Sequence, residues 1–316
     1  CPDARGCPAM KWGWFGLYLR GMAMGAADLV PGVSGGTIAL ITGIYDRLID
    51  AISSVGWQAI KHLLSGEIKN AWMHIDGGFL LTVGAGILSA VVALASLLSW
   101  LMLHYPLPLW SLFCGLVLAS SLYLFLDSCS AWSLRDYGLW VAGIGVALVI
   151  GIMQATQLPV SYGTVFLAGA IAISAMLLPG ISGSFLLLLM GMYQPVIEAI
   201  VSADIATLAV FVAGCLVGLI GFSRLLKTLM RTAGRATMAV LYGFLLGSMI
   251  TLWPWQRTVS TVVDRHGELR IVQSLPVSPA HYADTVGDPL LLLCAIAFIS
   301  GLIAVRFLSS HARSGQ

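Results

Sequence analysis

Charged residues are scarce in this chain. Asp, Glu, Lys and Arg make up 9% of its 316 residues, whereas soluble domains contain about a quarter. None occurs from Phe79 to Leu126 or from Tyr137 to Ile197. Segments this long and this apolar are typical of helices that cross a lipid bilayer. The composition therefore excludes a soluble domain and predicts an all-α polytopic membrane protein.

Other absences narrow the function. No run of Lys and Arg indicates a nucleic-acid site, and the net charge of +2 is spread over the polar segments. The six histidines fall in loops or at the ends of apolar segments, and no His, Asp or Glu set has metal-ligand spacing. The six cysteines lack the spacing of a disulfide framework. We therefore expect no metal, no cofactor and no nucleic-acid partner.

Two copies of one motif organise the sequence. The first is Pro31–Thr37 and the second is Pro179–Phe185, at a spacing of 179 − 31 = 148 residues. Each copy reads Pro-Gly-x-Ser-Gly and is followed by an apolar run that ends in Gly-x-Tyr, at Tyr45 and Tyr193. Proline and glycine end helices. Each copy therefore predicts a break between two helices inside apolar sequence.

The apolar runs predict the helical segments. We expect helices over Lys11–Val30, Thr37–Ser54, Phe79–Leu103, Leu107–Leu126, Tyr137–Met153, Gly163–Leu178, Phe185–Val201 (interrupted at Pro195), Ile205–Leu229, Ala236–Trp253 and Leu290–Phe307. The segment Trp57–Gly77 is a polar, amphipathic connector, and residues 254–288 form a polar loop.

The repetition extends beyond the motif. At a shift of 128 residues, Gly115–Ser120 matches Gly243–Ser248. We therefore divide a single membrane domain (1–316) into repeat 1 (11–126), a linking span (137–153), repeat 2 (163–253), an extracytoplasmic loop (254–288) and a final span (290–307). Each repeat holds a helix–turn–helix and two transmembrane helices, and the remaining two spans are extra.

Basic residues predict the orientation. Arg224, Lys227, Arg231 and Arg235 surround one turn, which the positive-inside rule places in the cytoplasm. Counting spans from this turn puts both termini in the cytoplasm. The single linking span makes the second repeat enter the membrane from the opposite face. The repeats are then inverted in topology, as in many secondary transporters.

The helices beside the motif are short. At a rise of ~1.5 Å per residue, Gly163–Leu178 is about 24 Å long, whereas the hydrocarbon core is about 30 Å thick. Irregular backbone at membrane depth occurs only where it lines a cavity or is buried in protein. We therefore favour two re-entrant hairpins, with tips that meet near the midplane, over two full crossings.

The motif has the chemistry of an anion site. A helix that starts near Ser34 has free backbone N–H groups and the positive end of its dipole there. Such a helix start suits phosphate or carboxylate. The candidate residues are Ser34, Gly35, Gly36, Thr37, Ser182, Gly183 and Ser184. The alternative is that the motifs are packing kinks, in which small residues allow close helix contact.

Ionisable residues inside apolar sequence are further candidates. Arg20 is a candidate contact of the anion, unless it extends to the membrane interface. Asp28 either pairs with Arg20 or carries a proton. The set of coupling or gating candidates is Asp28, Asp46, Tyr45, Tyr193, Glu198 and Arg224, for which a structural role at the interface is the alternative.

The segments Met24–Thr37, Gly43–Tyr45 and Leu178–Ser184 together resemble the polyprenyl-phosphate transporter family of bacterial membrane proteins. The resemblance extends from about Trp14 to Phe307. It implies translocation of undecaprenyl phosphate across the cytoplasmic membrane, which recycles this lipid carrier for peptidoglycan and other envelope glycans. It also implies that the motif residues hold the phosphate. The residues themselves indicate only an anion-binding transporter.

The hypothesis is therefore a translocase for undecaprenyl phosphate in the bacterial cytoplasmic membrane, surrounded by membrane lipids, with a homodimer as one possible assembly. The alternative is a transporter or channel for a small soluble anion such as phosphate, which needs an enclosed aqueous path. A membrane enzyme that acts on lipid phosphates would need a catalytic base near Ser34 or Ser182. The sequence favours a protein that is not an enzyme.

Overall fold

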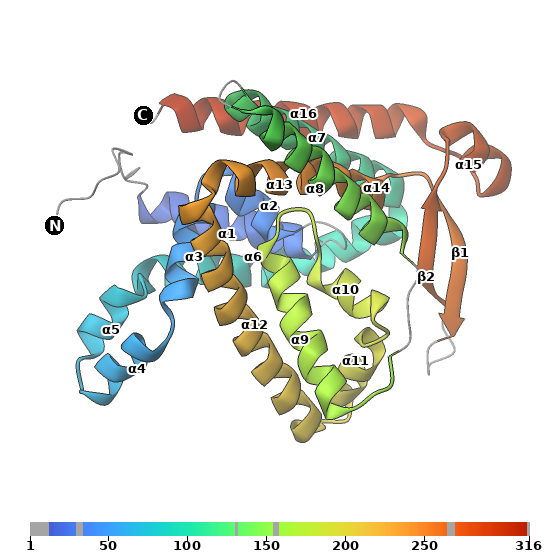
Figure 1. The fold of residues 1–316 in the computed structure, drawn as a ribbon. Coiled ribbons are helices and arrows are strands. Elements are labelled where there is room, and N and C mark those ends of the chain that lie inside the picture. The colour runs from blue at the N-terminus through green and yellow to red at the C-terminus, as the bar shows by residue number, and fades with distance from the viewer. Residues whose placement is uncertain (1–12, 30–33, 130–131, 154–157, 264–268, 315–316) are drawn as a thin grey trace.

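The structure is a computed structural model, which describes residues 13–29, 34–129, 132–153, 158–263 and 269–314. These residues form helices and one antiparallel two-stranded sheet (Figure 1). The first half contains α1 (Trp14–Asp28), α2 (Gly35–Ile41), α3 (Tyr45–Ser54), α4 (Trp57–Leu64), α5 (Ile68–His74), α6 (Gly77–His104), α7 (Pro106–Ser128) and α8 (Leu134–Ile152). The second half contains α9 (Tyr162–Leu177), α10 (Gly183–Leu189), α11 (Tyr193–Val201), α12 (Ile205–Thr232), α13 (Gly234–Gly247), α14 (Met249–Leu252), β1 (Gln256–Val263), β2 (Leu269–Pro276), α15 (Pro279–Thr285) and α16 (Leu291–Ser314).

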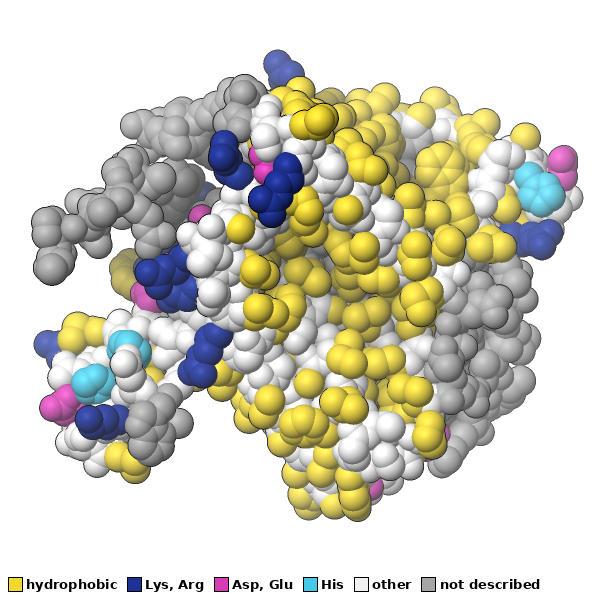
Figure 2. All heavy atoms as spheres, in the orientation of Figure 1, with side chains coloured by type: hydrophobic (Ala, Val, Ile, Leu, Met, Phe, Trp, Pro, Cys, Tyr) yellow, Lys and Arg dark blue, Asp and Glu magenta, His cyan; other side chains and the backbone are white. Residues whose placement is uncertain are grey.

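Several helices can cross a membrane. Within the described residues, α6, α7, α8, α12 and the α13–α14 pair have the length and apolar composition of spans. In Figure 2, hydrophobic side chains cover the middle of the visible face, and most of the visible Lys and Arg side chains lie at one margin. The predicted all-α polytopic membrane architecture is confirmed.

The two motifs lie between broken helices. After the first turn the chain forms α2 and α3, which Gly43 separates at φ 72°. After the second turn it forms α10 and α11, which Gly191 separates at φ 68° and which are bent by 106°. Only glycine adopts this left-handed conformation without strain. The expected unbroken helix over Thr37–Ser54 was therefore wrong.

The expected interruption at Pro195 was also wrong. Pro195 lies in the first turn of α11, where its missing N–H has no helical partner to lose. The predicted amphipathic connector and the predicted polar loop both contain regular structure. The connector Trp57–Gly77 forms α4 and α5, and residues 254–288 form the β1–β2 hairpin and α15.

Close glycine contacts join the longer helices in pairs. A methyl group on Gly21 or Gly86 would collide with the backbone carbonyl of the facing helix, in the pair α1–α6. The same holds for Gly169 and Gly214 in the pair α9–α12. Small residues of this kind let helix backbones approach closely inside membranes.

The contacts of these glycines recur at matching positions. Gly86 faces Tyr18 and Gly214 faces Phe166, with 214 − 86 = 128 and 166 − 18 = 148. These are the two shifts that relate the halves of the sequence. The pairs α7–α16 and α8–α13 match as well: the contacts are Gly115 with Phe298, Gly301 with Leu112, Gly243 with Trp140 and Gly143 with Val240. Here α7 corresponds to α13 at 243 − 115 = 128, and α8 corresponds to α16 at 301 − 143 = 158.

The largest buried cluster surrounds the first hairpin. It combines Met24 of α1, Tyr45 and Ile49 of α3, Phe79 of α6 and Leu177 of α9, together with residues of α12 and α13. Tyr45, Ile49 and Phe79 are among the most deeply buried large side chains. The return arm of the first hairpin therefore lies in the centre of the protein, and its tip is held against the second hairpin.

Candidate functional site

The start of α2 is capped by the protein's own side chains. Ser34 is the N-cap, and its Oγ accepts a hydrogen bond of 3.1 Å from the Gly36 N–H. The Gly35 N–H donates to Oδ1 of Asp28 at 2.6 Å. The Thr37 N–H donates to the Ser34 carbonyl at 2.9 Å. An anionic side chain thus occupies the place at which we expected the substrate anion.

The two hairpins are joined by three hydrogen bonds. Ser34 Oγ donates to the Met176 carbonyl at 3.1 Å. The Tyr45 hydroxyl donates to the Leu177 carbonyl at 2.6 Å. In the opposite direction, the Gly180 N–H donates to Thr37 Oγ1 at 2.9 Å. Ser34, Thr37 and Tyr45 are each at most 2% exposed, so the side chains that join the two tips are buried in protein.

The start of α10 is different. Ser182 is its N-cap, but the Ser182 side chain caps no backbone N–H and instead shares a 2.7 Å hydrogen bond with Ser184 Oγ. Among the described residues, no group accepts a hydrogen bond from the N–H of Gly183 or Ser184. The residue that corresponds to Asp28 is Met176, at 176 − 28 = 148. The second tip therefore lacks the carboxylate that fills the first.

A small pocket adjoins the second tip. It is bordered by Gly180, Ser182, Phe185, Ser248 and Thr251, with apolar residues of α8 on the other side. Its volume of about 10 Å³ is near the space that one water molecule needs. Gly180 has φ 89° and packs against the Ser248 side chain. The pocket is therefore too small for a phosphate group.

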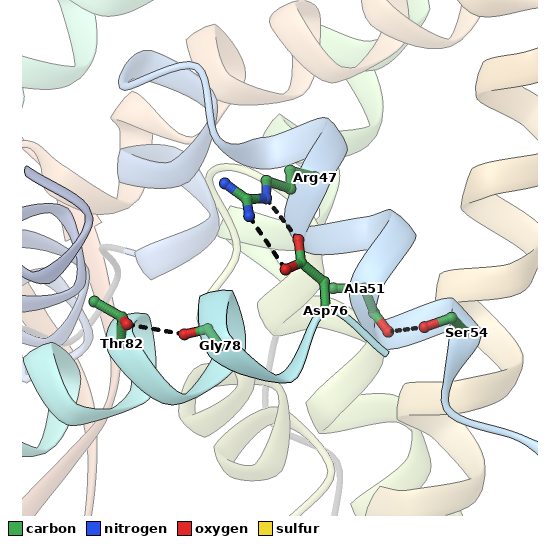
Figure 3. Close-up of polar contacts among 6 residues, drawn as sticks. All are labelled: Arg47, Ala51, Ser54, Asp76, Gly78 and Thr82. Carbon is green, nitrogen blue, oxygen red and sulfur yellow. Dashed lines mark hydrogen bonds and ion pairs between the residues drawn. The ribbon is translucent and has the colours of Figure 1, made fainter. Parts of the chain in front are cut away.

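Charged residues of α3 pair with the neighbouring helices. Arg47, in the first turn of α3, forms a two-point ion pair with Asp76 at 2.6 and 3.1 Å (Figure 3). The Arg47 guanidinium also lies over the Phe79 ring. Lys227 of α12 pairs with Asp50 at 3.0 Å. These contacts tie the return arm of the first hairpin to α6 and to α12.

Arg224 of α12 caps the C-terminal end of α3. Its guanidinium donates to the carbonyls of Ser53 and Val55 at 3.3 and 3.2 Å. These carbonyls lie at the C-terminus of α3, where a positive charge is favourable. Serine occupies the corresponding position of α6, Ser96 at 224 − 128. The structure thus places Arg224 away from the tips, in a contact that the second hairpin lacks.

The remaining candidates are not at the junction. Arg20 donates to the Gly16 carbonyl within α1 at 3.0 Å, and its separation from Asp28 by 28 − 20 = 8 positions corresponds to about 12 Å of helix. Asp46 lies in the first turn of α3, and Tyr193 is the first residue of α11. Glu198 of α11 accepts a hydrogen bond of 3.4 Å from the Gln194 side chain. Pro31, Gly32 and Val33 of the first motif fall outside the described residues.

Sequence reasoning missed two features of the junction. Asp28 was considered as a partner of Arg20 or a proton carrier, but its partner here is the Gly35 N–H. The signal was an acidic residue just before the Pro-Gly turn, within reach of the next helix start. The contribution of Ser248 and Thr251 to the pocket had no signal, because α14 is distant from the motif in sequence.

The long apolar helices and the two pairs of broken helices define a polytopic membrane protein. Residues 24–270 match the family model described as undecaprenyl phosphate translocase-like. A relative from Vibrio cholerae, named polyprenyl-phosphate transporter, is 40% identical over 296 residues, which cover 92% of this chain and 96% of the relative. The chain therefore belongs to the undecaprenyl phosphate translocase-like family.

A second relative extends the comparison to another bacterium. The Staphylococcus aureus protein that is also named polyprenyl-phosphate transporter is 34% identical over 261 residues, which cover 76% of this chain and 86% of that protein. No solved structure matches this chain. The family membership agrees with the resemblance of the two motifs.

Proposed function

We propose that this protein moves undecaprenyl phosphate across the bacterial cytoplasmic membrane, so that the lipid carrier returns to envelope glycan synthesis. The names of its two relatives support the substrate class. The observation in this chain that supports it most directly is the contrast between the hairpin tips. One helix start is filled by a carboxylate, and the other has unpaired N–H groups beside hydroxyl side chains.

The phosphate binds first at the second tip in this proposal. Gly183 and Ser184 offer backbone donors, and Ser182 and Ser184 offer hydroxyls, at the positive end of a short helix dipole. The polyprenyl chain stays in the lipid while the phosphate is held. The protein supplies binding and movement only and is not an enzyme.

Transfer to the first tip requires Asp28 to leave. Two anions cannot share the Gly35 N–H, and their repulsion is strong in an apolar interior. Asp28 is exposed on its outer side, so the carboxylate can turn away or take up a proton. The exchange of phosphate for carboxylate at Gly35 is therefore the step that couples transport to Asp28.

The matching glycine contacts support a division of the transporter into two equivalent halves. We assign α1–α8 to one half and α9–α16 to the other, so that α8 and α16 become the equivalent last helices rather than extra spans. If the first hairpin re-enters the membrane, the three crossings α6, α7 and α8 start the second half on the opposite face. The halves are then inverted, and both termini are cytoplasmic.

Reconstituted liposomes with undecaprenyl phosphate labelled in one leaflet test the function. We expect protein-dependent movement of the label to the other leaflet. Absence of that movement in vesicles with correctly folded protein refutes the proposal. Uptake of free inorganic phosphate without movement of the lipid would instead favour the soluble-anion alternative.

A pair of serine variants tests the site. Ser182→Ala with Ser184→Ala removes both hydroxyls at the second tip with little change in volume, so transport should fall while the protein stays folded. Ser89→Ala is the matched control, because Ser89 is an exposed helical serine on α6 that bonds only to the Ala85 carbonyl. Equal transport by the double variant and the control contradicts the assignment of the second tip.

A further inference from the structure

Among the side chains of α4 and α5 that the structure describes, the large apolar ones lie on the outside. Leu64, Ile68 and Met73 are 78%, 69% and 60% exposed, and Trp72 is 46% exposed. The buried residues include two alanines, Ala59 in α4 and Ala71 in α5. A helical hairpin in water would show the opposite arrangement, with the large apolar residues between its helices. Its outer apolar surface therefore requires a cover.

The chain connections place this hairpin at the membrane surface. Only Val55 and Gly56 separate α3 from α4, and only Ile75 and Asp76 separate α5 from α6. Helix α6 is a candidate span of 28 residues, so its first turn at Gly77 lies at one boundary of the bilayer. The hairpin is held at both ends and extends sideways from the helices (Figure 1).

Tryptophan side chains mark the same level. The Trp72 ring lies against Gly77 and the Trp14 ring lies against Gly78, at the start of α6. Tryptophan is enriched at the boundary between headgroups and acyl chains. The polar residues of the hairpin fit this level, because Lys61 and Lys69 are exposed and His62 pairs with Glu67 at 2.8 Å. In Figure 2, Lys, His and Glu side chains lie together on this projection.

We propose that the α4–α5 hairpin is an interfacial anchor that binds the surface of the bilayer that α6 crosses. Leu64, Ile68, Trp72 and Met73 enter the upper acyl region, and the lysines stay among the headgroups. Amphipathic helices of this kind insert about 5–10 Å. The anchor fixes the depth of α3 and α6, to which the hairpin is joined. It therefore holds the C-terminal end of α3 at a constant depth in the membrane.

Photo-crosslinking to lipids tests the anchor in the full-length protein. Two phospholipids are used in vesicles, one with a diazirine near the headgroup and one with a diazirine at the chain end. We expect the shallow probe to label the peptide that contains Ile68 and Met73 more than the deep probe does. Helix α6 is the internal standard, because Leu88 and Val92 are 67% and 83% exposed on a spanning helix and should favour the deep probe.

A charge variant completes the test. Ile68→Glu with Met73→Glu should abolish the shallow labelling of the hairpin and leave the labelling of α6 unchanged. Lys69→Glu, on the same helix, should keep it. A hairpin that neither lipid labels, while α6 is labelled, refutes the anchor and indicates water or a protein partner as its surroundings. Labelling of the hairpin mainly by the deep probe also refutes it.

Discussion

Replacement of Gly86 by alanine tests the close helix packing. A Cβ atom at this position collides with the Tyr18 carbonyl of α1. Both groups belong to helix backbones, so neither can move without shifting a helix. Overpacking of this kind costs about 1–3 kcal/mol. Alanine also gains about 0.5–1 kcal/mol over glycine within a helix, so the net effect of one variant alone would be ambiguous.

Gly84 provides the matched control on the same helix. Nothing lies within 4 Å of a Cβ atom at Gly84, so Gly84→Ala has the gain in helix propensity without the collision. The difference between the two variants is therefore the packing cost, about 1–3 kcal/mol in the free energy of unfolding. Gly214→Ala should resemble Gly86→Ala, because Gly214 meets the Phe166 carbonyl in the equivalent place.

The assay is unfolding of the purified protein in mixed micelles, followed by circular dichroism as the fraction of denaturing detergent rises. Gly86→Ala should unfold at a lower fraction than Gly84→Ala. If the two variants unfold together, or if Gly86→Ala is the more stable, the helices do not approach as closely as described. A stable Gly214→Ala beside an unstable Gly86→Ala would refute the equivalence of the two halves.

Three further predictions concern the junction and its support. Tyr45→Phe leaves the buried carbonyl of Leu177 without its donor, so it should destabilise the protein by about 1–3 kcal/mol in the same unfolding assay; an unchanged unfolding curve contradicts the junction. Arg224→Gln removes the positive charge that caps α3. Because Arg224 is exposed, the free energy of unfolding should fall by no more than about 1 kcal/mol, and a larger fall would point to a different role. Asp28→Asn keeps an acceptor for the Gly35 N–H without the negative charge, so undecaprenyl phosphate should bind more tightly and move more slowly in liposomes. Unchanged affinity and rate would contradict the exchange at Gly35.

The sequence predicted the parts of the fold that depend on local chemistry. The second Pro-Gly turn and the N-cap at Ser34 follow from residues that can adopt few backbone conformations. The spans follow from apolar length. Within such spans, the position of a break was harder to predict. Pro195 drew attention because proline breaks helices, but Gly191 makes the bend because it alone adopts positive φ there.

Long-range partners were beyond the reach of sequence patterns. Asp28 is an acidic residue in apolar sequence, but its hydrogen bond with the Gly35 N–H joins two helices and has no local sequence pattern. The strands of the 256–276 hairpin are rich in Val, Ile and Thr, which favour β-structure. The polar composition of residues 254–288 predicts a loop, whereas their β propensity agrees with the observed strands. The last helix of each half packs against the other half: α16 packs on α7, and α8 packs on α13. Only the contacts between glycines and backbone carbonyls in the structure reveal these pairings.

That exchange of last helices constrains how the protein is made. Helix α7 packs against α16, and Gly115 and Phe298, which touch, are 298 − 115 = 183 residues apart. After α7 has been made, the ribosome must therefore still add α8 and all the elements from α9 to α15 before the partner of α7 emerges. During that time the groove around Gly115 faces lipid or another protein. The newly made first half is thus an obligate intermediate with an open seam, on which membrane insertion factors and quality-control proteases can act.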